Sequence, residues 1–555
     1  MKNLLTKKWT GFVVALLLIT IVNSISSIFY TRFDFTAEKR FTLSGVSKKV
    51  LGQIPQEVKI DVYLDGDLPA GFRHLRSEIR DMLSDLKAFS GGRLQFAFTN
   101  PLEGSEDVKQ KNIEVLTSKG VKPTSLTVKK NSGVSQQLIF PTAIVSYGDK
   151  EMVVNLLENR VGIAPEEALN NSIQNLEYNF INALSKVTSQ GKPLIGFTEG
   201  HQELSDLELA DGMKGLEEGY IPGRVDLKKI SLDDLQQLKV LVIAKPLSPF
   251  SESEKYKINT FIRRGGNVIW AIDQSDADLD SLNQTGEHAV LARQLNLDDM
   301  LFKYGIRLNY ALIEDLNCAQ IPISIGNGQL KLLPWAFYPL IVPLSPHPVV
   351  KNLEAIRSEF AGSIDTVAAK GIKKEVILSS SPFAKVIELP AMISLQMIDQ
   401  LTDINSFKHT AVPIAVLLEG VFPDVFNNRP LPPETEKSPL YDAVSAKMLV
   451  VADGDIFKNQ ISPGDRSPFP LGYDQYTQHQ YGNKSFLMNA VDYLAGDADL
   501  IELRQKEVRL RLLDKVKIEN ESIFWQFLNV LIPLIVLVGA GVIHYFYRKR
   551  KYGMP

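Results

Sequence analysis

The sequence predicts an α/β membrane protein that crosses the membrane twice and carries a large extracytoplasmic region of at least two α/β domains, the second a doubly wound sheet. Two observations support this prediction. Apolar stretches without a formal charge cover residues 9–31 and 522–547. At 1.5 Å per residue each is roughly 35–39 Å long as a helix, enough to cross a hydrocarbon core of about 30 Å. Between them, predicted strands alternate with helices, which is the pattern of α/β domains.

Basic residues lie outside both apolar stretches. Lys2, Lys7 and Lys8 precede the first, and residues 548–551 (RKRK) follow the second. Because Lys and Arg are enriched on the cytoplasmic side of membrane segments, both tails are expected in the cytoplasm. The predicted organisation is an N-terminal anchor at 1–31, a first extracytoplasmic domain at 45–190, a second at 191–460, a membrane-proximal segment at 461–521, a transmembrane helix at 522–547 and a cytoplasmic tail at 548–555.

The first apolar stretch has a second interpretation, a cleaved signal peptide, because Ser24, Ile25 and Ser26 form a small-x-small cleavage site. Its apolar character continues through residues 28–30, which is longer than a signal peptide needs and favours a retained anchor. No cysteine follows the stretch, which excludes a lipoprotein. In the second stretch, aromatic residues at both ends match the belts of a membrane helix, and Pro533 is tolerated there.

The first domain opens with a strand, a helix and a second strand. Residues 58–64 alternate with period two, residues 72–89 have apolar side chains at helical spacing, and residues 94–98 form another strand. A helix joins the two strands, so they are expected to be parallel with a right-handed crossover. The later elements are strands at 125–128, 138–145 and 151–156 and a long helix at 166–189.

The second domain begins with a short strand at 193–196 and a helix at 204–217. A continuous apolar run at 240–244 predicts a strand buried on both faces. Ser251 and Glu254 form a capping box for a helix that ends at a Gly-Gly pair before the next strand, which indicates a βαβ unit. Further elements are a strand at 267–272, a buried strand at 447–452, a helix at 485–494 and a strand or stalk at 500–513, while 285–420 has no clear pattern.

Residues 332–350 (LLPWAFYPLIVPLSPHPVV) are uncharged but contain five prolines. Prolines remove too many amide donors for a lipid-exposed helix, so this stretch is not a third crossing. It is expected to be extended chain, either buried or forming an apolar docking patch. Burial is favoured because such patches are uncommon on the surface of a monomer.

Composition and motifs exclude several classes of function. The net charge of −3 and the lack of a basic stripe argue against nucleic acid binding. A single cysteine, Cys318, excludes an intramolecular disulfide and a Cys-rich zinc site. The one Gly-Lys pair, at 191–192, is followed by Pro193, so no phosphate-binding loop is present. Cys318 lacks the flanking glycines of a nucleophile elbow and is expected to be a buried small residue.

Two sets of polar residues follow predicted strands of the second domain, at the edge where open α/β sheets bind ligands. They are Thr198, Glu199, His201 and Glu203 after the first strand, and Asp453, Asp455 and Asn459 after the strand at 447–452. We predict ligand or partner contacts there; for the first set the alternative is a helix N-terminus with favourable acidic charge. No His-Glu-x-x-His motif accompanies His201, so no catalytic, cofactor or metal site is predicted.

Short motifs recur in order along nearly the whole chain. They include VYLDGDLP at 62–69, FTNP at 98–101, FTEGHQE at 197–203, VVADGD at 450–455 and NAVDYL at 489–494. In this order they resemble the GldG family, the gliding-motility-associated ABC transporter auxiliary proteins of Bacteroidota. The resemblance implies that the second domain is an amidotransferase-like sheet without its nucleophile.

The resemblance further implies a non-catalytic auxiliary or substrate-binding-like subunit in the bacterial inner membrane, with the bulk of the chain periplasmic. Its partners would be an ABC permease subunit, a cytoplasmic ATPase subunit and other envelope components of motility or secretion. No cofactor is implied. Two alternatives stay open: a periplasmic scaffold or sensor outside any transporter, and an extracytoplasmic hydrolase that depends on His201 or Cys318.

Overall fold

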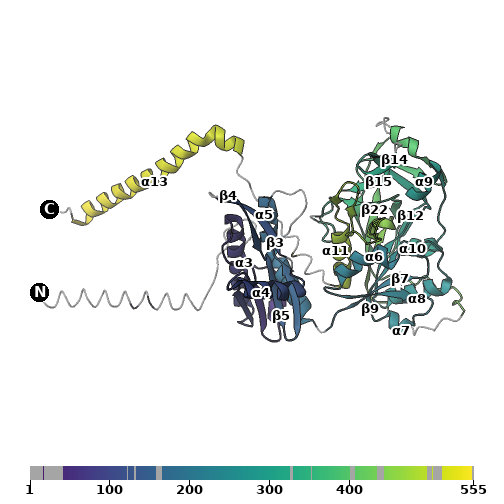
Figure 1. Cartoon of the computed structure of the whole chain (residues 1–555), viewed down its shortest axis with the longest axis horizontal. Helices are drawn as coiled ribbons and strands as arrows, with labels where there is room; N and C mark the ends of the chain where they lie inside the picture. Colours follow the sequence, from purple (N-terminus) through teal and green to yellow (C-terminus); the bar gives the residue numbers. More distant parts are fainter. Residues whose placement is uncertain are drawn as a thin grey trace. The chain divides into compact units, whose positions relative to one another are not determined.

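The computed structural model describes residues 17, 20, 42–121, 123–130, 133–157, 165–189, 191–324, 329–351, 353–400, 407–433, 443–496, 503 and 515–552. The predicted N-terminal membrane segment at 9–31 and the predicted strand or stalk at 500–513 lie outside this part of the chain, except for isolated residues. The chain divides into two units, a larger one that reaches to Lys506 and a smaller one that contains the C-terminal helix, and each is described by itself (Figure 1).

A four-stranded sheet in the order β2-β1-β5-β6 forms the first α/β region. Its elements are α2 (Gly45–Gln53), β1 (Val58–Val62), α3 (Ala70–Phe89), β2 (Leu94–Phe98), β5 (Thr142–Tyr147), β6 (Lys150–Asn155) and α5 (Pro165–Thr188). β1 and β2 are parallel, as the helix between them predicts, whereas β5 is antiparallel to both β1 and β6. Leu75, Ile79 and Leu83 lie at helical spacing on α3 and are buried in one cluster with β1 and α5.

Two elements of this region differ from the prediction. The stretch expected to be one strand at 138–145 is divided between β4 (Gly133–Ile139) and β5, because Pro141 lies between them and cannot donate to a ladder. β4 instead pairs with β3 (Thr124–Lys130). The helix α4 (Glu106–Ser118) was not predicted, because Val108 and Val115 are nearly half exposed and leave only a weak apolar stripe.

A seven-stranded sheet in the order β18-β22-β23-β10-β9-β7-β8 forms the second α/β region. Its strands are β7 (Leu194–Glu199), β8 (Ile221–Asp226), β9 (Leu238–Ala244), β10 (Asn267–Ala271), β18 (Ile372–Ser379), β22 (Pro413–Gly420) and β23 (Ala446–Val451). The strands from β23 to β8 are parallel, and β22 and β18 add an antiparallel pair at one side. The central strands are apolar along their length because both faces are covered.

Helices cover both faces of this sheet. They are α6 (Asp206–Leu216), α8 (Glu252–Arg263), α10 (Asp298–Tyr304) and α11 (Asn483–Ala495). Successive residues of a strand point to opposite faces, and accordingly Val242 of β9 packs in one cluster with α6 and α11, while Ile243 packs in another with α8 and α10. The sheet is therefore doubly wound. Both hydrogen bonds of the predicted capping box of Ser251 and Glu254 are present at α8.

Residues 272–412 lie between β10 and β22 and contain several small two- and three-stranded sheets beside the large one. The Pro-rich stretch begins here as β15 (Leu330–Ile341), which pairs with β14 (Cys318–Ser324). Residues 335–338 of β15 are buried, so the expected burial is confirmed for this half. Val342 and Leu344, which follow the strand, are exposed.

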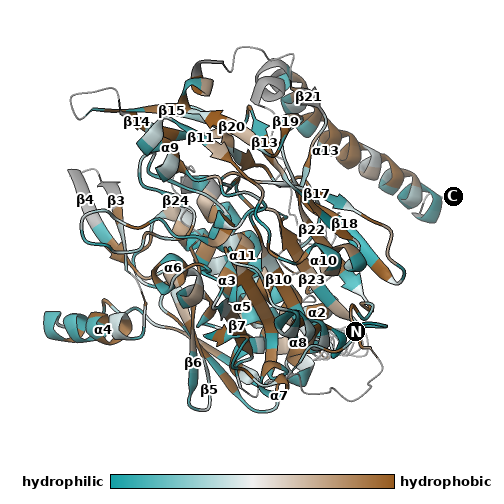
Figure 2. Cartoon of the chain, turned by 90° about the vertical axis from the view of Figure 1, so that its right-hand side faces the viewer, coloured by the Kyte–Doolittle hydropathy of each residue, from teal (hydrophilic) through white to brown (hydrophobic). Residues whose placement is uncertain are grey.

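The smaller unit contains α13 (Lys515–Tyr552). Among the residues that the structure describes, its segment Phe524–Lys551 is the one helix long and apolar enough to cross a membrane. The 28 residues of this segment extend about 42 Å. Figure 2 shows α13 mostly in the hydrophobic colour, with a hydrophilic C-terminal end where the basic residues 548–551 lie. The helix agrees with the crossing predicted at 522–547.

Candidate functional site

The loops that follow the parallel strands meet at one edge of the seven-stranded sheet. β7 leads through α6 to β8 on one side, whereas β9 leads through α8 to β10 on the other, so the winding direction reverses between β7 and β9. Such a reversal opens a crevice beyond the carboxyl ends of the two strands, where doubly wound sheets bind ligands. His201 follows β7 and Lys245 follows β9 at this edge.

The imidazole of His201 is buried between two carboxylates. Its Nδ1 lies 3.4 Å from Glu203 Oε1, and its Nε2 lies 3.2 Å from Glu254 Oε1. The ring stacks on Phe250 with the two centroids 4.0 Å apart. Glu254 also accepts a hydrogen bond from the amide of Ser251 in the capping box. This cluster therefore fastens the loop after β7 to the first turn of α8.

The two carboxylates determine the charge of His201. Burial by itself lowers the pKa of His201, but Glu203 and Glu254 outweigh it and raise the pKa to about 9. Burial opposes ionisation of Glu254 as well, yet His201 and Ser251 lower the pKa of this carboxyl to about 2. At neutral pH the cluster is thus a buried imidazolium between two carboxylates, with each ring nitrogen within ion-pair distance of one of them.

The residues predicted after β7 occupy two different environments. The side chains of Thr198, His201 and Glu203 are buried, and His201 is only 2% exposed, so it presents no free face to a ligand. Glu199 is about half exposed, and its carboxylate lies 3.6 Å from Arg224 Nε. Glu254 was not predicted as the second partner of His201, because it was already assigned to the capping box with Ser251.

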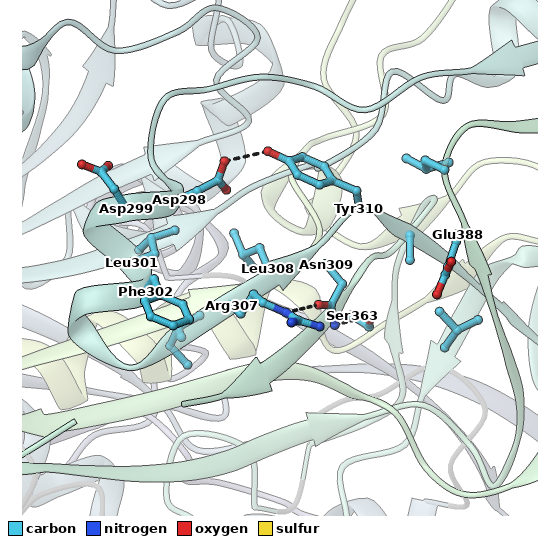
Figure 3. Close-up of a pocket in the computed structure, with 14 residues that line it drawn as sticks. Asp298, Asp299, Leu301, Phe302, Arg307, Leu308, Asn309, Tyr310, Ser363 and Glu388 are labelled. Carbon is cyan, nitrogen blue, oxygen red and sulfur yellow. Dashed lines mark hydrogen bonds between the residues drawn. The ribbon is translucent and has the colours of Figure 1, made fainter. Parts of the chain in front are cut away.

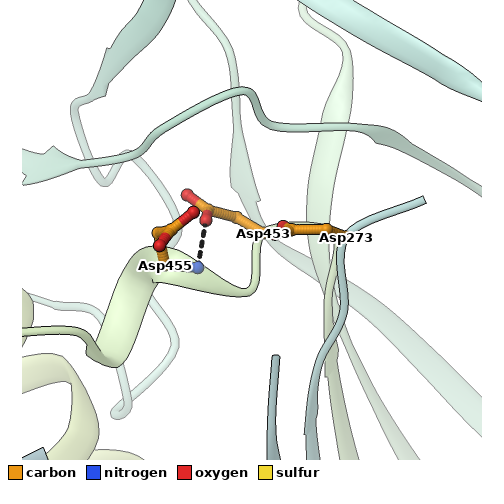
Figure 4. A group of neighbouring side chains, drawn as sticks. All are labelled: Asp273, Asp453 and Asp455. Carbon is orange, nitrogen blue, oxygen red and sulfur yellow. Dashed lines mark hydrogen bonds between the residues drawn. The ribbon is translucent and has the colours of Figure 1, made fainter. Parts of the chain in front are cut away.

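The residues predicted after β23 lie in an acidic cluster with Asp273, which follows β10. Carboxylate oxygens of Asp273, Asp453 and Asp455 lie within 4.8 Å of one another (Figure 4). The amide of Asp455 donates to Asp453 Oδ1 at 2.8 Å, and the amide of Glu359 donates to Asp453 Oδ2 at 3.0 Å. Burial and the neighbouring carboxylates raise the pKa of Asp453 well above its usual value.

Two lysines compensate negative charge in this cluster. Lys245 Nζ pairs with Asp455 Oδ2 and lies 3.5 Å from Asp273 Oδ2. Lys458 Nζ lies 3.2 Å from the other oxygen of Asp455. Three carboxylates at this spacing are ligands that Mg²⁺ or Ca²⁺ prefers, but here the Lys245 ammonium holds the place of a cation. Lys245 has a φ of +57°, a left-handed conformation that costs non-glycine residues about 1 kcal/mol or more.

A pocket of about 280 Å³ opens beside this cluster. Asp455, which begins the short helix η3 (Asp455–Phe457), lines it together with Lys458 and Asn459. Arg357 and Tyr338, from β16 (Ile356–Arg357) and β15, line another part. The structure thus brings Asp455 and Asn459, which were predicted as contacts, together with basic residues from distant parts of the chain that no local pattern revealed.

A larger cavity of about 690 Å³ lies between α10 and the strands that follow it (Figure 3). Most of its polar side chains already have protein partners. Tyr310 donates to Asp298 at 2.6 Å, Arg307 donates to Asn309 at 2.9 Å, and Asn309 donates to Ser363 at 3.1 Å. These contacts leave little polar capacity for a ligand, so the smaller pocket beside Asp455 is the better candidate site.

Comparison with known proteins identifies the family of the second α/β region. The family described as an ABC-type uncharacterized transport system matches residues 192–490, from the start of β7 into α11. The chain belongs to this ABC transport auxiliary family. A second family, a domain of unknown function, matches residues 37–146 in the first α/β region.

A related protein can also be aligned along almost the whole chain. An uncharacterized protein of Borreliella burgdorferi is 22% identical in an alignment of 546 positions that covers 95% of each chain. Among solved structures, the mmIFT52 N-terminal domain has 12% identity and a TM-score of 0.33, covering 55% of this chain and 97% of that one. A putative ThuA-like protein from Parabacteroides merdae has 10% identity and a TM-score of 0.27, covering 59% and 94%.

The region shared with the auxiliary family contains both the His201 cluster and the pocket beside Asp455. It also contains Cys318, on β14. Burial and the nearby Asp315 raise the pKa of the Cys318 thiol to about 11, so at neutral pH almost none of it is the nucleophilic thiolate. This environment does not suit Cys318 to the nucleophilic role that the hydrolase alternative requires.

Proposed function

We propose that this chain is a non-catalytic, substrate-binding-like auxiliary subunit of an inner-membrane ABC transporter linked to gliding motility and associated secretion. The main support for the proposal is that one chain contains both the auxiliary-family region at 192–490 and a helix long and apolar enough to cross a membrane. In this proposal a separate permease and a separate cytoplasmic ATPase provide transport and energy, since the sequence has no phosphate-binding loop.

The proposed topology has two membrane crossings, at 9–31 and 522–547, with both tails cytoplasmic. Lys2, Lys7 and Lys8 before the first segment and residues 548–551 after the second support this orientation. The two α/β regions would then lie in the periplasm, where Glu199, about half exposed, is the most accessible of the predicted contact residues, while Asp455 is buried and lines the pocket. Thr198, His201, Glu203 and Asp453 would hold the surrounding loops in place.

Buried ion clusters support the non-catalytic part of the proposal. A general acid or base needs a pKa near the working pH and access to substrate. His201 has a pKa of about 9 and is buried, and Lys245 is paired with two carboxylates. In these positions the two groups stabilise the fold rather than exchange protons with a substrate.

Purification of the tagged full chain from mild detergent tests the proposal. We expect an ATPase subunit and a permease subunit to be recovered with it, and recovery of the chain without either would refute the transporter role. A matched variant, Val536→Arg, places a charge in the middle of α13 at a cost of about 3 kcal/mol for insertion and should reduce recovery of the permease. Tyr476→Ala, in the other unit, should leave recovery unchanged.

The link to gliding is tested separately. Deletion of the gene should abolish spreading of colonies on agar, and deletion of the partner ATPase should have the same effect. If loss of the ATPase leaves spreading intact while loss of this chain does not, the chain acts as an envelope scaffold outside a transporter. If neither deletion affects spreading, the motility part of the proposal is wrong.

A further inference from the structure

The larger cavity, between α10 and β12 (Ile306–Asn309), has an apolar wall that is accessible from outside. Half of its lining residues are apolar. Two of them, Phe302 on α10 and Val386 on β19 (Phe383–Glu388), are 54% and 41% exposed. Because a ligand that covers these side chains removes apolar surface from water, binding of an apolar body here is favourable. The volume of about 690 Å³ lies within the range of ligand cavities.

Two of the charged residues that line the cavity already have partners of opposite charge. The charged lining residues are Asp298, Asp299, Arg307 and Glu388. Asp299 lies 2.8 Å from Lys255 Nζ and 2.6 Å from Arg429 Nη1. Lys255 is shared with Glu252, at 2.9 Å. Arg307 Nη2 lies 3.0 Å from Asp365 Oδ2, so its charge is compensated as well.

The other two carboxylates, Asp298 and Glu388, remain accessible and uncompensated. Both residues are exposed, and no cation among the described residues lies within ion-pair distance of either one. Asp298 accepts a hydrogen bond from Tyr310 at 2.6 Å, and burial together with this bond raises the pKa of Tyr310 to about 12, so the hydroxyl stays protonated. Figure 3 shows Asp298 and Glu388 on opposite sides of Tyr310. The cavity therefore carries negative charge at two places on its wall.

These features discriminate between ligands by charge. The two carboxylates repel an anion, and a neutral ligand meets few free hydrogen-bonding groups, because most polar side chains of the cavity are paired within the protein. An ammonium group pairs with a carboxylate and is attracted to the faces of Phe302 and Tyr310, which both line the cavity. The apolar wall is then left to contact the rest of the ligand.

We propose that this cavity binds a small organic cation in which one or two ammonium groups, paired with Asp298 or Glu388, are attached to an aromatic or methylene body. Such a molecule compensates the free negative charge and covers the apolar wall at the same time. An ammonium ion alone would gain only exposed ion pairs, which are weak. The inference rests on the proposed function in one respect: the cation would be what the transporter handles or senses.

Calorimetric titration of the full chain in mild non-ionic detergent at low salt tests this inference, because salt screens exposed charges. The probes are phenethylamine, which carries one ammonium group at neutral pH, and hexamethylenediamine, which carries two. Phenylethanol and hexanediol are their neutral counterparts, phenylpropanoate is an anion with the same aromatic body, and ammonium chloride supplies a cation without an apolar body. We expect saturable binding of at least one of the two amines, and at least about tenfold weaker binding of its neutral counterpart, of phenylpropanoate and of ammonium. Tighter binding of the diamine assigns two ammonium groups, and tighter binding of phenethylamine assigns one.

Variants locate the binding. Asp298→Asn combined with Glu388→Gln should weaken binding at least about tenfold, and the two single variants show which carboxylate pairs with the cation. Arg307→Gln removes the cation that lines the cavity and should tighten binding about threefold, a gain that misfolding cannot produce. Glu114→Gln, at an exposed carboxylate of α4, should bind as the wild type does.

Three outcomes would overturn the inference. These are neutral or anionic counterparts that bind as tightly as the amines, a double variant that binds as tightly as the wild type, and no saturable binding of either amine up to about 10 mM. The cavity variants should still recover the permease and ATPase. Failure of amine binding therefore leaves the proposed function standing, and failure of co-purification leaves the cavity result interpretable.

Discussion

Replacing His201 with glutamine should destabilise the seven-stranded region most strongly near pH 6 and much less above pH 9. In the folded chain the pKa of His201 rises from 6.5 to about 9. Because a tenfold change in proton affinity corresponds to about 1.4 kcal/mol, this rise contributes about 3 kcal/mol to the free energy of unfolding. Glutamine cannot carry the charge, so Glu203 and Glu254 would be left as buried, uncompensated carboxylates.

The pH dependence follows from the direction of each pKa change. Because the pKa of His201 is raised in the folded chain, its contribution to the free energy of unfolding is fully present below the unfolded-state pKa of 6.5. This contribution is lost as the pH rises through about 9. The pKa of Glu254 is lowered from 4.5 to about 2, so its contribution is present above 4.5 and is lost as the pH falls through about 2. The cluster is therefore most stabilising between pH 4.5 and 6.5.

The assay is hydrogen exchange measured by mass spectrometry on peptides that cover β7 and α8. After correction for intrinsic exchange rates, it gives the local free energy of opening at each pH. The difference between wild type and His201→Gln should be about 4 kcal/mol at pH 6, the sum of the charge and packing contributions, and should fall towards about 1 kcal/mol at pH 10, where packing alone differs. His288→Gln is the control, since its ion pair with Asp276 spans 3.8 Å and the side chain is 27% exposed. An equal difference at pH 6 and pH 10 would refute a charged His201.

Three further substitutions test other parts of the second region. Lys245→Met removes an ammonium from Asp455 and Asp273 and leaves Asp455 only Lys458, so it should cost about 3 kcal/mol in urea denaturation. Lys373→Met, at a lysine that is 69% exposed, should cost less than about 0.5 kcal/mol, and equal costs would contradict the role of the Lys245 pair. Ser251→Ala opens the capping box and should cost about 1 kcal/mol, seen as faster exchange in the first turn of α8, and unchanged exchange would count against the cap. Gly420→Ala would place a Cβ 2.1 Å from Gly371 O, so this variant should lose about 3 kcal/mol or more, while Gly223→Ala, which meets nothing within 4 Å, should unfold like the wild type.

Strands that are buried on both faces were predictable from the sequence. β9, β10 and β23 are continuous apolar runs, because both faces of these strands are covered by helices or loops. The segment 285–420 was not predictable in the same way. Many of its strands have only two to five residues. The longer strand β18 alternates irregularly between exposed and buried residues around a bulge, so it shows neither period two nor a continuous apolar run.

The candidate site was only partly predictable for a related reason. Asp453 and Asp455 were identified because they follow a buried strand, which is local information. Their cation, Lys245, is 210 residues away from Asp455 in sequence and reaches it only because β9, β10 and β23 are neighbours in the sheet. Arg357 comes from the two-residue strand β16, inside the stretch 285–420 where no pattern was found. Charge pairing across a parallel sheet depends on strand order, which one sequence does not reveal.

The position of β23 also has a consequence for how the chain is made. β23 lies between β10 and β22 in the sheet, although it is synthesised after both. About 175 residues separate Ala271, at the end of β10, from Ala446, at the start of β23. At about 5–20 residues per second, roughly 9–35 s pass between the synthesis of these two strands. During this interval the edge of β10 has no partner, and once β22 is made, about 26 residues before β23 begins, its facing edge has none either. Open apolar edges pair wrongly or aggregate. Folding must therefore keep these edges apart until β23 arrives, which makes it sensitive to translation rate and to chaperones.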